Sequence, residues 1–202
     1  ERFPKGGLLH IHPSATIDRT TADDLLRVNN PKINMEPIFN GIDNSDGNKM
    51  LYSEERSWLT TLSIGINYLD LPEKQQNKFK SFLFLPIGHQ PFARFNAVFD
   101  FFGFVTPDKQ SYEKAIFAFV KKAVNEGVIY IEFTASPKPD LLEIIEKVEM
   151  ETGVTIRINN AFRRTKDLNT LNNDWNLFIS RPINKYVTGI DFLDNEEGNP
   201  AL

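Results

Sequence analysis

The sequence predicts an α/β fold in which helices cover a parallel sheet. Three observations lead to this prediction. Segments rich in β-branched and aromatic residues alternate with amphipathic segments, the strand segments are apolar almost throughout, and glycine or proline separates one segment from the next. Both a barrel and an open sheet satisfy this pattern.

The first strand is expected to be buried and to cover residues 6–12, a short apolar run of sequence Gly-Gly-Leu-Leu-His-Ile-His that ends before a proline. Residues 29–50 are dense in Asn, Asp, Gly and Pro and carry no sustained period, which predicts a long, mobile loop. Apolar residues from Phe92 to Phe102 recur at helical spacing, and they predict a helix.

The second half of the chain alternates regularly between helix and strand. Helical spacing of apolar residues predicts helices at residues 111–126, 140–152 and 169–180, each followed by glycine or proline. Runs of β-branched and aromatic residues predict strands at 128–134, 154–158 and 186–192.

The composition excludes several classes of protein. The chain has 202 residues, of which 41% are hydrophobic and 25% are charged. This composition is typical of a soluble globular protein rather than of a disordered or fibrous one. A net charge of −4 argues against nucleic-acid binding, and no apolar run approaches the roughly 18 residues that span a bilayer. The absence of cysteine excludes thiol catalysis and cysteine-ligated zinc. A metal would have to be held by His, Asp or Glu.

Histidine is scarce, and its placement is informative. The three histidines are His10, His12 and His89. Because side chains alternate along a strand, His10 and His12 are expected on one face, where both imidazoles could reach one ion such as zinc. At the carboxyl end of a barrel strand the pair would lie where barrel enzymes place their active sites. Two polar residues at a strand end without a metal remain the alternative.

Several segments together carry a resemblance to a known family. Residues 3–12, Phe-Pro-Lys-Gly-Gly-Leu-Leu-His-Ile-His, resemble the opening segment of the adenosine deaminase family, and are most similar to its adenosine deaminase-related growth factor branch. Four more segments resemble the family in the same order: 95–102 (Phe-Asn-Ala-Val-Phe-Asp-Phe-Phe), 129–132 (Ile-Tyr-Ile-Glu), 163–167 (Arg-Arg-Thr-Lys-Asp) and 187–191 (Val-Thr-Gly-Ile-Asp).

The resemblance implies the N-terminal half of a (β/α)8, TIM-type barrel of the metal-dependent hydrolase kind, with residues 1–202 forming one incomplete domain. It also implies a zinc-dependent purine nucleoside aminohydrolase that converts adenosine to inosine and ammonia. By matching position, His10 and His12 would be zinc ligands. The same matching places Phe92, Phe95 and Phe99 along the nucleoside pocket.

Two segments depart from the family pattern at the expected substrate site. Pro13 and Ser14 stand where the family has a carboxylate that contacts the substrate sugar. Asp194 stands where the family has a glycine whose N–H faces the purine, and Asp both crowds that position and adds charge. These departures favour the alternative that the chain is a non-catalytic relative that binds a nucleoside or a protein.

The family's remaining metal ligands and catalytic residues would lie beyond Leu202, so no catalytic residue is expected within this chain. The chain opens without a start methionine and is expected to be processed or cut from a longer one. A purine nucleoside is the expected partner, with neither nucleic acid nor membrane involved. A half barrel has open edges, and these are expected to associate with another copy or with the missing half. The compartment, cytoplasmic or secreted, stays open.

Overall fold

The computed structural model describes residues 6–33, 65–82, 105–163, 166–180 and 184–193. The chain divides into two compact units. Unit 1 comprises residues 1–13 and 119–202, and unit 2 comprises residues 14–118. None of the described helices is both long and apolar enough to cross a membrane.

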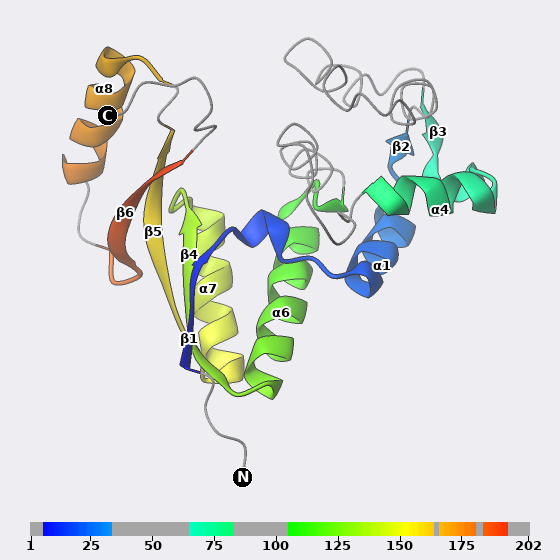
Figure 1. The fold of residues 1–202 in the computed structure, drawn as a ribbon, viewed down its shortest axis with the longest axis horizontal. Helices are drawn as coiled ribbons and strands as arrows, with labels where there is room; N and C mark the ends of the chain where they lie inside the picture. The colour runs from blue at the N-terminus through cyan, green and yellow to red at the C-terminus, as the bar shows by residue number, and fades with distance from the viewer. Residues whose placement is uncertain (1–5, 34–64, 83–104, 164–165, 181–183, 194–202) are drawn as a thin grey trace, which may run out of the picture. The chain divides into compact units, whose positions relative to one another are not determined.

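Unit 1 contains a four-stranded sheet in which every neighbouring pair is parallel (Figure 1). The spatial order is β1 (Gly6–Ile11), β4 (Val128–Ala135), β5 (Thr155–Arg163) and β6 (Val187–Leu193). Helix α6 (Lys109–Asn125) leads into β4, while α7 (Pro139–Thr152) and α8 (Leu168–Ser180) connect β4 to β5 and β5 to β6. The strands therefore follow one another in space as they do in sequence, which is the pattern of repeated β–α–β units.

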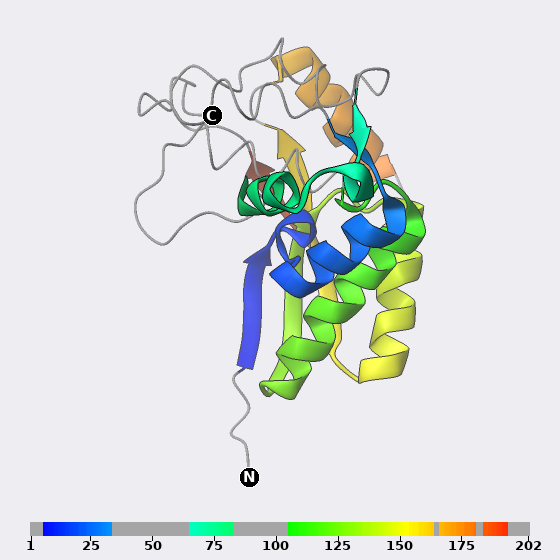
Figure 2. The same ribbon diagram turned by 90° about the vertical axis from the view of Figure 1, so that its right-hand side faces the viewer.

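The hydrophobic core of unit 1 lies between the sheet and its helices. Ile131 and Phe133 of β4 are fully buried, and the Phe133 ring lies 6.4 Å from that of Phe119. Helix α7 covers the same face of the sheet, as Figure 2 shows, and buries four aliphatic side chains: Leu141, Ile144, Ile145 and Val148. Because side chains alternate, Glu132 and Thr134 lie on the opposite face of β4.

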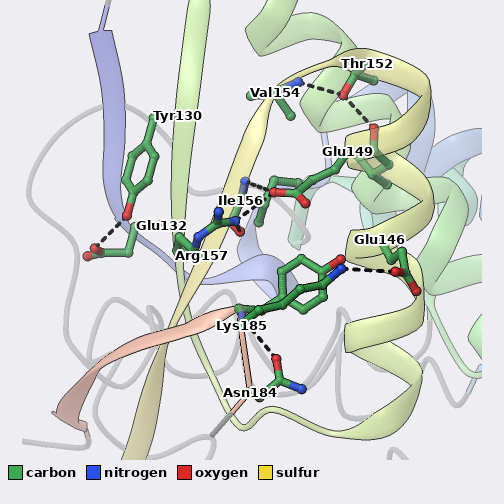
Figure 3. Close-up of polar contacts among 12 residues, drawn as sticks. Tyr130, Glu132, Glu146, Glu149, Thr152, Val154, Ile156, Arg157, Asn184 and Lys185 are labelled. Carbon is green, nitrogen blue, oxygen red and sulfur yellow. Dashed lines mark hydrogen bonds and ion pairs between the residues drawn. The ribbon is translucent and has the colours of Figure 1, made fainter.

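Polar contacts fix α7 to the sheet near the amino ends of β5 and β6 (Figure 3). A carboxylate oxygen of Glu149 accepts hydrogen bonds from the Ile156 backbone N–H, at 2.6 Å, and from the Arg157 guanidinium, at 2.9 Å. The Lys185 ammonium lies 3.2 Å from a Glu146 carboxylate oxygen. These contacts lie at the end of the sheet opposite the carboxyl ends of the strands, where barrel enzymes place their sites.

Unit 2 contains the short helical segment η1 (Pro13–Ala15, of which Pro13 belongs to unit 1), α1 (Arg19–Asn29), β2 (Lys32–Ile33), β3 (Ile66–Asn67), η2 (Tyr68–Asp70) and α4 (Glu73–Phe82). Strands β2 and β3 pair antiparallel. The fully buried Tyr68 donates a hydrogen bond to Asp23 of α1 at 3.2 Å, and burial is the main reason that the pKa of Tyr68 rises to about 12. The end of α1 is joined to the start of α6, since the Ser111 hydroxyl donates to the Asn29 side chain at 3.1 Å.

The predicted strands and helices of the second half of the chain are confirmed. Strand β5 continues to Arg163, five residues beyond the expected end. Strand β1 differs from the expected buried strand, because Leu9 is 64% exposed at one end of the described sheet. The expected loop of residues 29–50 is interrupted by β2, and residues 34–50 lie outside the described residues. The helix expected from Phe92 to Phe102 lies outside them as well.

Candidate active site

Two histidines lie at the carboxyl end of β1. His10 is the last residue but one of the strand, and His12 follows directly after it. Their ring centroids are 5.2 Å apart with the ring planes at 74°. His10 has a left-handed backbone, with φ of 57°, and lies where the register of β1 against β4 shifts. A local irregularity of the strand thus accompanies the pairing of the two imidazoles, at a cost of about 1–2 kcal/mol for a residue other than glycine.

The His10 imidazole contacts a carboxylate from the far end of the sheet. Nδ1 of His10 lies 3.0 Å from Oδ2 of Asp191 on β6, and the Thr134 hydroxyl of β4 donates to the same oxygen at 3.4 Å. Three interstrand steps separate β1 from β6, which is about 14 Å in a flat sheet. The two side chains meet only because the sheet curves strongly towards this face. Such curvature is typical of a barrel wall rather than of an open sheet.

A second polar group lies on the same face of the sheet. The Asn159 amide of β5 donates to Oε1 of Glu132 on β4 at 2.5 Å, and the Tyr130 hydroxyl lies 3.5 Å from the other Glu132 oxygen. Gly189 of β6 is opposite Asn159 in the register, and a Cβ at that position would overlap the Asn159 side-chain oxygen. The glycine therefore makes room for the Asn159–Glu132 hydrogen bond.

The surroundings of His12 favour its neutral form. Partial burial is the main cause that lowers the pKa of His12, the nearby His10 lowers it further, and the Asp191 carboxylate acts in the opposite direction. Neutral imidazole is the form that binds a metal ion. At neutral pH His12 is therefore ready to act as a metal ligand.

Of the other predicted site residues, the structure describes Ser14 alone. Ser14 lies in η1, in unit 2, and is half-buried. The remaining ones, and the third histidine, lie outside the described residues: Phe92, Phe95, Phe99, Asp194 and His89. Asp191 and Thr134 were not predicted as site residues. Asp191 could have been predicted, because it stands at the carboxyl end of a predicted strand, where barrel enzymes place their active-site residues.

The donor atoms partly fit a metal site. Imidazole nitrogen and carboxylate oxygen are the ligands that zinc takes where cysteine is absent. Within residues 6–33, 65–82, 105–163, 166–180 and 184–193, however, no group of three or more His, Asp or Glu side chains is arranged to hold a metal ion. His10 and His12 can thus provide part of a ligand set, and further ligands would have to come from elsewhere.

No protein-family model matches the sequence, and a search of curated proteins finds no significant match. Solved structures do match. The chain is similar to the crystal structure of adenine deaminase from Arthrobacter aurescens, with a TM-score of 0.59 and 15% identity over 98% of this chain and 51% of the other. It is also similar to an amidohydrolase from Burkholderia ambifaria with bound zinc, with a TM-score of 0.56 and 12% identity over 98% of this chain and 46% of the other.

The fold is that of half a TIM barrel. The chain spans about half the length of the solved structures it matches, and its parallel strands follow the barrel order. Of the two folds that the sequence allowed, the barrel is therefore correct and the open sheet is not. The two structures are TIM-barrel amidohydrolases, and neither supports a particular likeness to the growth factor branch.

Proposed function

We propose that the protein is a metal-dependent aminohydrolase acting on a purine nucleoside such as adenosine, with zinc as the metal and this half barrel supplying part of the site. The arrangement of His10, His12 and Asp191 carries the proposal. Two imidazoles and a carboxylate meet at the carboxyl ends of parallel strands, on the concave face of a barrel wall. Barrel enzymes place their chemistry at this end.

His10 and His12 would hold the metal, and Asp191 would orient His10. A hydrogen bond from Nδ1–H of His10 to the Asp191 carboxylate, 3.0 Å away, would leave the lone pair of Nε2 for the metal. A bound zinc ion supplies a water molecule whose pKa is lowered towards neutrality. Partial burial lowers the pKa of His12 and so favours the neutral imidazole that a metal requires.

The substrate would contact residues taken from the family resemblance. Phe92, Phe95 and Phe99 would cover the purine base, while Ser14 and Asp194 would lie beside the nucleoside. The third histidine and the proton-transferring glutamate of such enzymes would come from a second half barrel, because this chain spans about half of the matched structures. The activity is thus a property of the whole protein.

The test measures bound metal and deamination in the full-length protein. Zinc content is determined by mass spectrometry, and adenosine and adenine are each followed by the ultraviolet absorbance change on deamination. His12→Ala should remove most of the zinc and the activity while changing stability little, because His12 lies at a strand end. His89→Ala is the matched control, since His89 is the remaining histidine outside the pair. A zinc-replete, fully active His12→Ala variant would end the metal assignment.

A nucleoside-binding relative without catalysis is the second candidate, and one observation favours it. Pro13 is buried and begins the short helical segment η1, where the family resemblance would require a substrate-binding carboxylate. Such a relative would raise its melting temperature with adenosine without forming product. Product formation by the wild-type protein decides against this candidate.

A further inference from the structure

A cavity of about 750 Å³ lies at the carboxyl ends of β4 and β5. Its walls are the connection from β4 to α7 at residues 136–139, the end of β5 at residues 160–163, and α8. Asn160 and Phe162 alternate along β5 with Asn159, which faces Glu132 on the concave side of the sheet. Asn160 and Phe162 therefore line the cavity from the helix-covered side of the sheet, and its described lining residues include none of His10, His12 and Asp191.

One wall of the cavity is apolar and aromatic. Phe162 and Phe178 meet edge to face, with ring centroids 5.6 Å apart, and Leu177 continues this surface. The Leu177 side chain lines the cavity and is also exposed to solvent. The volume and the mixed lining are those of a small-molecule pocket, for which 300–1,000 Å³ is typical.

Cations line the cavity as well. Lys138, Arg163 and Lys166 contribute three positive charges, and Asp174, the one carboxylate among the described lining residues, pairs with Lys166 at 2.6 Å. Within the described part of the chain, neither Lys138 nor Arg163 forms an ion pair or a side-chain hydrogen bond. Lys138 also precedes the first turn of α7, where backbone N–H groups and the helix dipole favour an anion.

A buried amide gives independent evidence for a ligand. Asn160 is only 7% exposed and lies on the same face of β5 as Phe162. Its side chain has no hydrogen-bond partner among the residues that the structure describes, although buried amides in folded proteins are nearly always hydrogen-bonded. An amide left without a partner destabilises the fold. A ligand in the cavity would provide the missing acceptor.

We propose that this cavity binds a small organic anion, with a carboxylate or phosphate group on an aromatic or aliphatic body. The anionic group takes charge-assisted hydrogen bonds from Lys138 and Arg163 and a hydrogen bond from the Asn160 amide. The apolar body packs on Phe162 and Phe178. The proposal rests on none of His10, His12 and Asp191, so it does not depend on the proposed metal site.

Trp175 provides a reporter of occupancy. Its ring lies 6.0 Å from that of Phe162 and 5.8 Å from that of Phe178. The chain has one other tryptophan, Trp58, so the Trp58→Phe background makes the fluorescence specific. Phenyl phosphate and benzoate are titrated as the complete probes, with inorganic phosphate and benzyl alcohol supplying only the anion or only the ring. We expect saturable binding of at least one complete probe, at least about tenfold tighter than either partial one.

Substitutions then separate binding from structure. The exposed pair Lys138→Gln/Arg163→Gln should weaken binding of the complete probe by about tenfold or more, whereas Lys185→Gln, an exposed lysine of unit 1 outside the cavity, should change it less than about twofold. Asn160→Leu should weaken binding and raise the melting temperature, because a buried amide without a partner is removed.

Three results would overturn the proposal. One is the absence of saturable binding of phenyl phosphate and benzoate up to about 10 mM. The second is equal affinity in the Lys138→Gln/Arg163→Gln and Lys185→Gln proteins. The third is an Asn160→Leu variant that melts at a lower temperature and binds unchanged, which would make the amide purely structural.

Discussion

Nδ1 of His10 lies 3.0 Å from Oδ2 of Asp191, so a side chain of the first strand meets one of the last strand in the described sheet. At this distance the carboxylate can accept a hydrogen bond from Nδ1–H, which would leave Nε2 as the acceptor. Pairs of this kind fix the tautomer and orientation of histidines that bind metals. In the proposed site Asp191 would therefore act as a positioning residue.

Replacing Asp191 by Asn should weaken zinc binding without abolishing it. The substitution keeps the size of the side chain but removes its charge, and loss of such a partner lowers metal affinity by about 10–100-fold. Competition with a chromophoric chelator measures the affinity. The control is Asp174→Asn in α8, which removes the carboxylate that pairs with Lys166. It should leave the zinc affinity unchanged. Equal affinity in both variants would contradict the role of Asp191.

Gly189→Ala should destabilise the sheet. The added Cβ would overlap the Asn159 side-chain oxygen and displace the amide that donates a hydrogen bond to Glu132. Loss of a hydrogen bond to a carboxylate costs about 1.5–3 kcal/mol, and urea unfolding measures this as a lower midpoint. In an Asn159→Ala background the obstructing atom is absent, so Gly189→Ala should then cost much less. Additive effects of the two substitutions would show that they do not interact.

Asp23→Asn should destabilise the protein at neutral pH and less so in acid. Burial opposes ionisation of Asp23, but hydrogen bonds from Arg27 and Lys80, the charge of Lys80 and the Tyr68 hydroxyl together hold its pKa below the ordinary 3.8. A lowered pKa stabilises the fold above pH 3.8, and this contribution is lost as pH falls through the folded-state value.

The check for Asp23 is urea unfolding of both proteins between pH 7 and pH 3. The stability gap between wild type and Asp23→Asn should be constant near neutrality and narrow below about pH 4. Asp24→Asn, the exposed neighbour on α1, serves as the comparison. A gap that does not change with pH would mean that the contacts of Asp23 do not depend on its charge.

Phe133→Ala should destabilise unit 1 strongly. The ring is fully buried and contacts Phe119, and removing a buried aromatic ring costs about 3–5 kcal/mol. Leu168→Ala on α8 is the matched surface change, because Leu168 is 73% exposed, and it should cost less than about 0.5 kcal/mol. If Phe133→Ala and Leu168→Ala lowered the free energy of unfolding by similar amounts, Phe133 would not belong to the core.

The sequence predicted the strands and helices of unit 1 because their signals are local. β-branched runs identify β4, and Gly153 ends α7 with a left-handed φ of 72°. The end of β5 was missed because Asn159 and Asn160 have low strand propensity, and pairing with β6 holds them extended.

Other elements were missed for different reasons. Helix α1 carried a recognisable signal, since Asp18 caps it and the buried residues Ala22, Leu25 and Leu26 recur at i, i+3 and i+4. The two-residue strands β2 and β3 have no such signal, because each depends on its distant partner. The histidine pair was visible in the sequence, whereas its contact with Asp191 depends on the curvature of the whole sheet.

Strand β1 has a consequence for how the protein folds. In the described sheet it pairs with β4 alone, and the whole of unit 2 separates the two strands in the chain. Closing so long a loop loses entropy before any contact is gained, whereas β4, β5 and β6 are joined by short connections. We expect pulse-labelled hydrogen exchange to protect β5 before β1, and simultaneous protection would contradict this order. His10 would then reach Asp191 only late in folding, so the candidate site would form when β1 docks on β4.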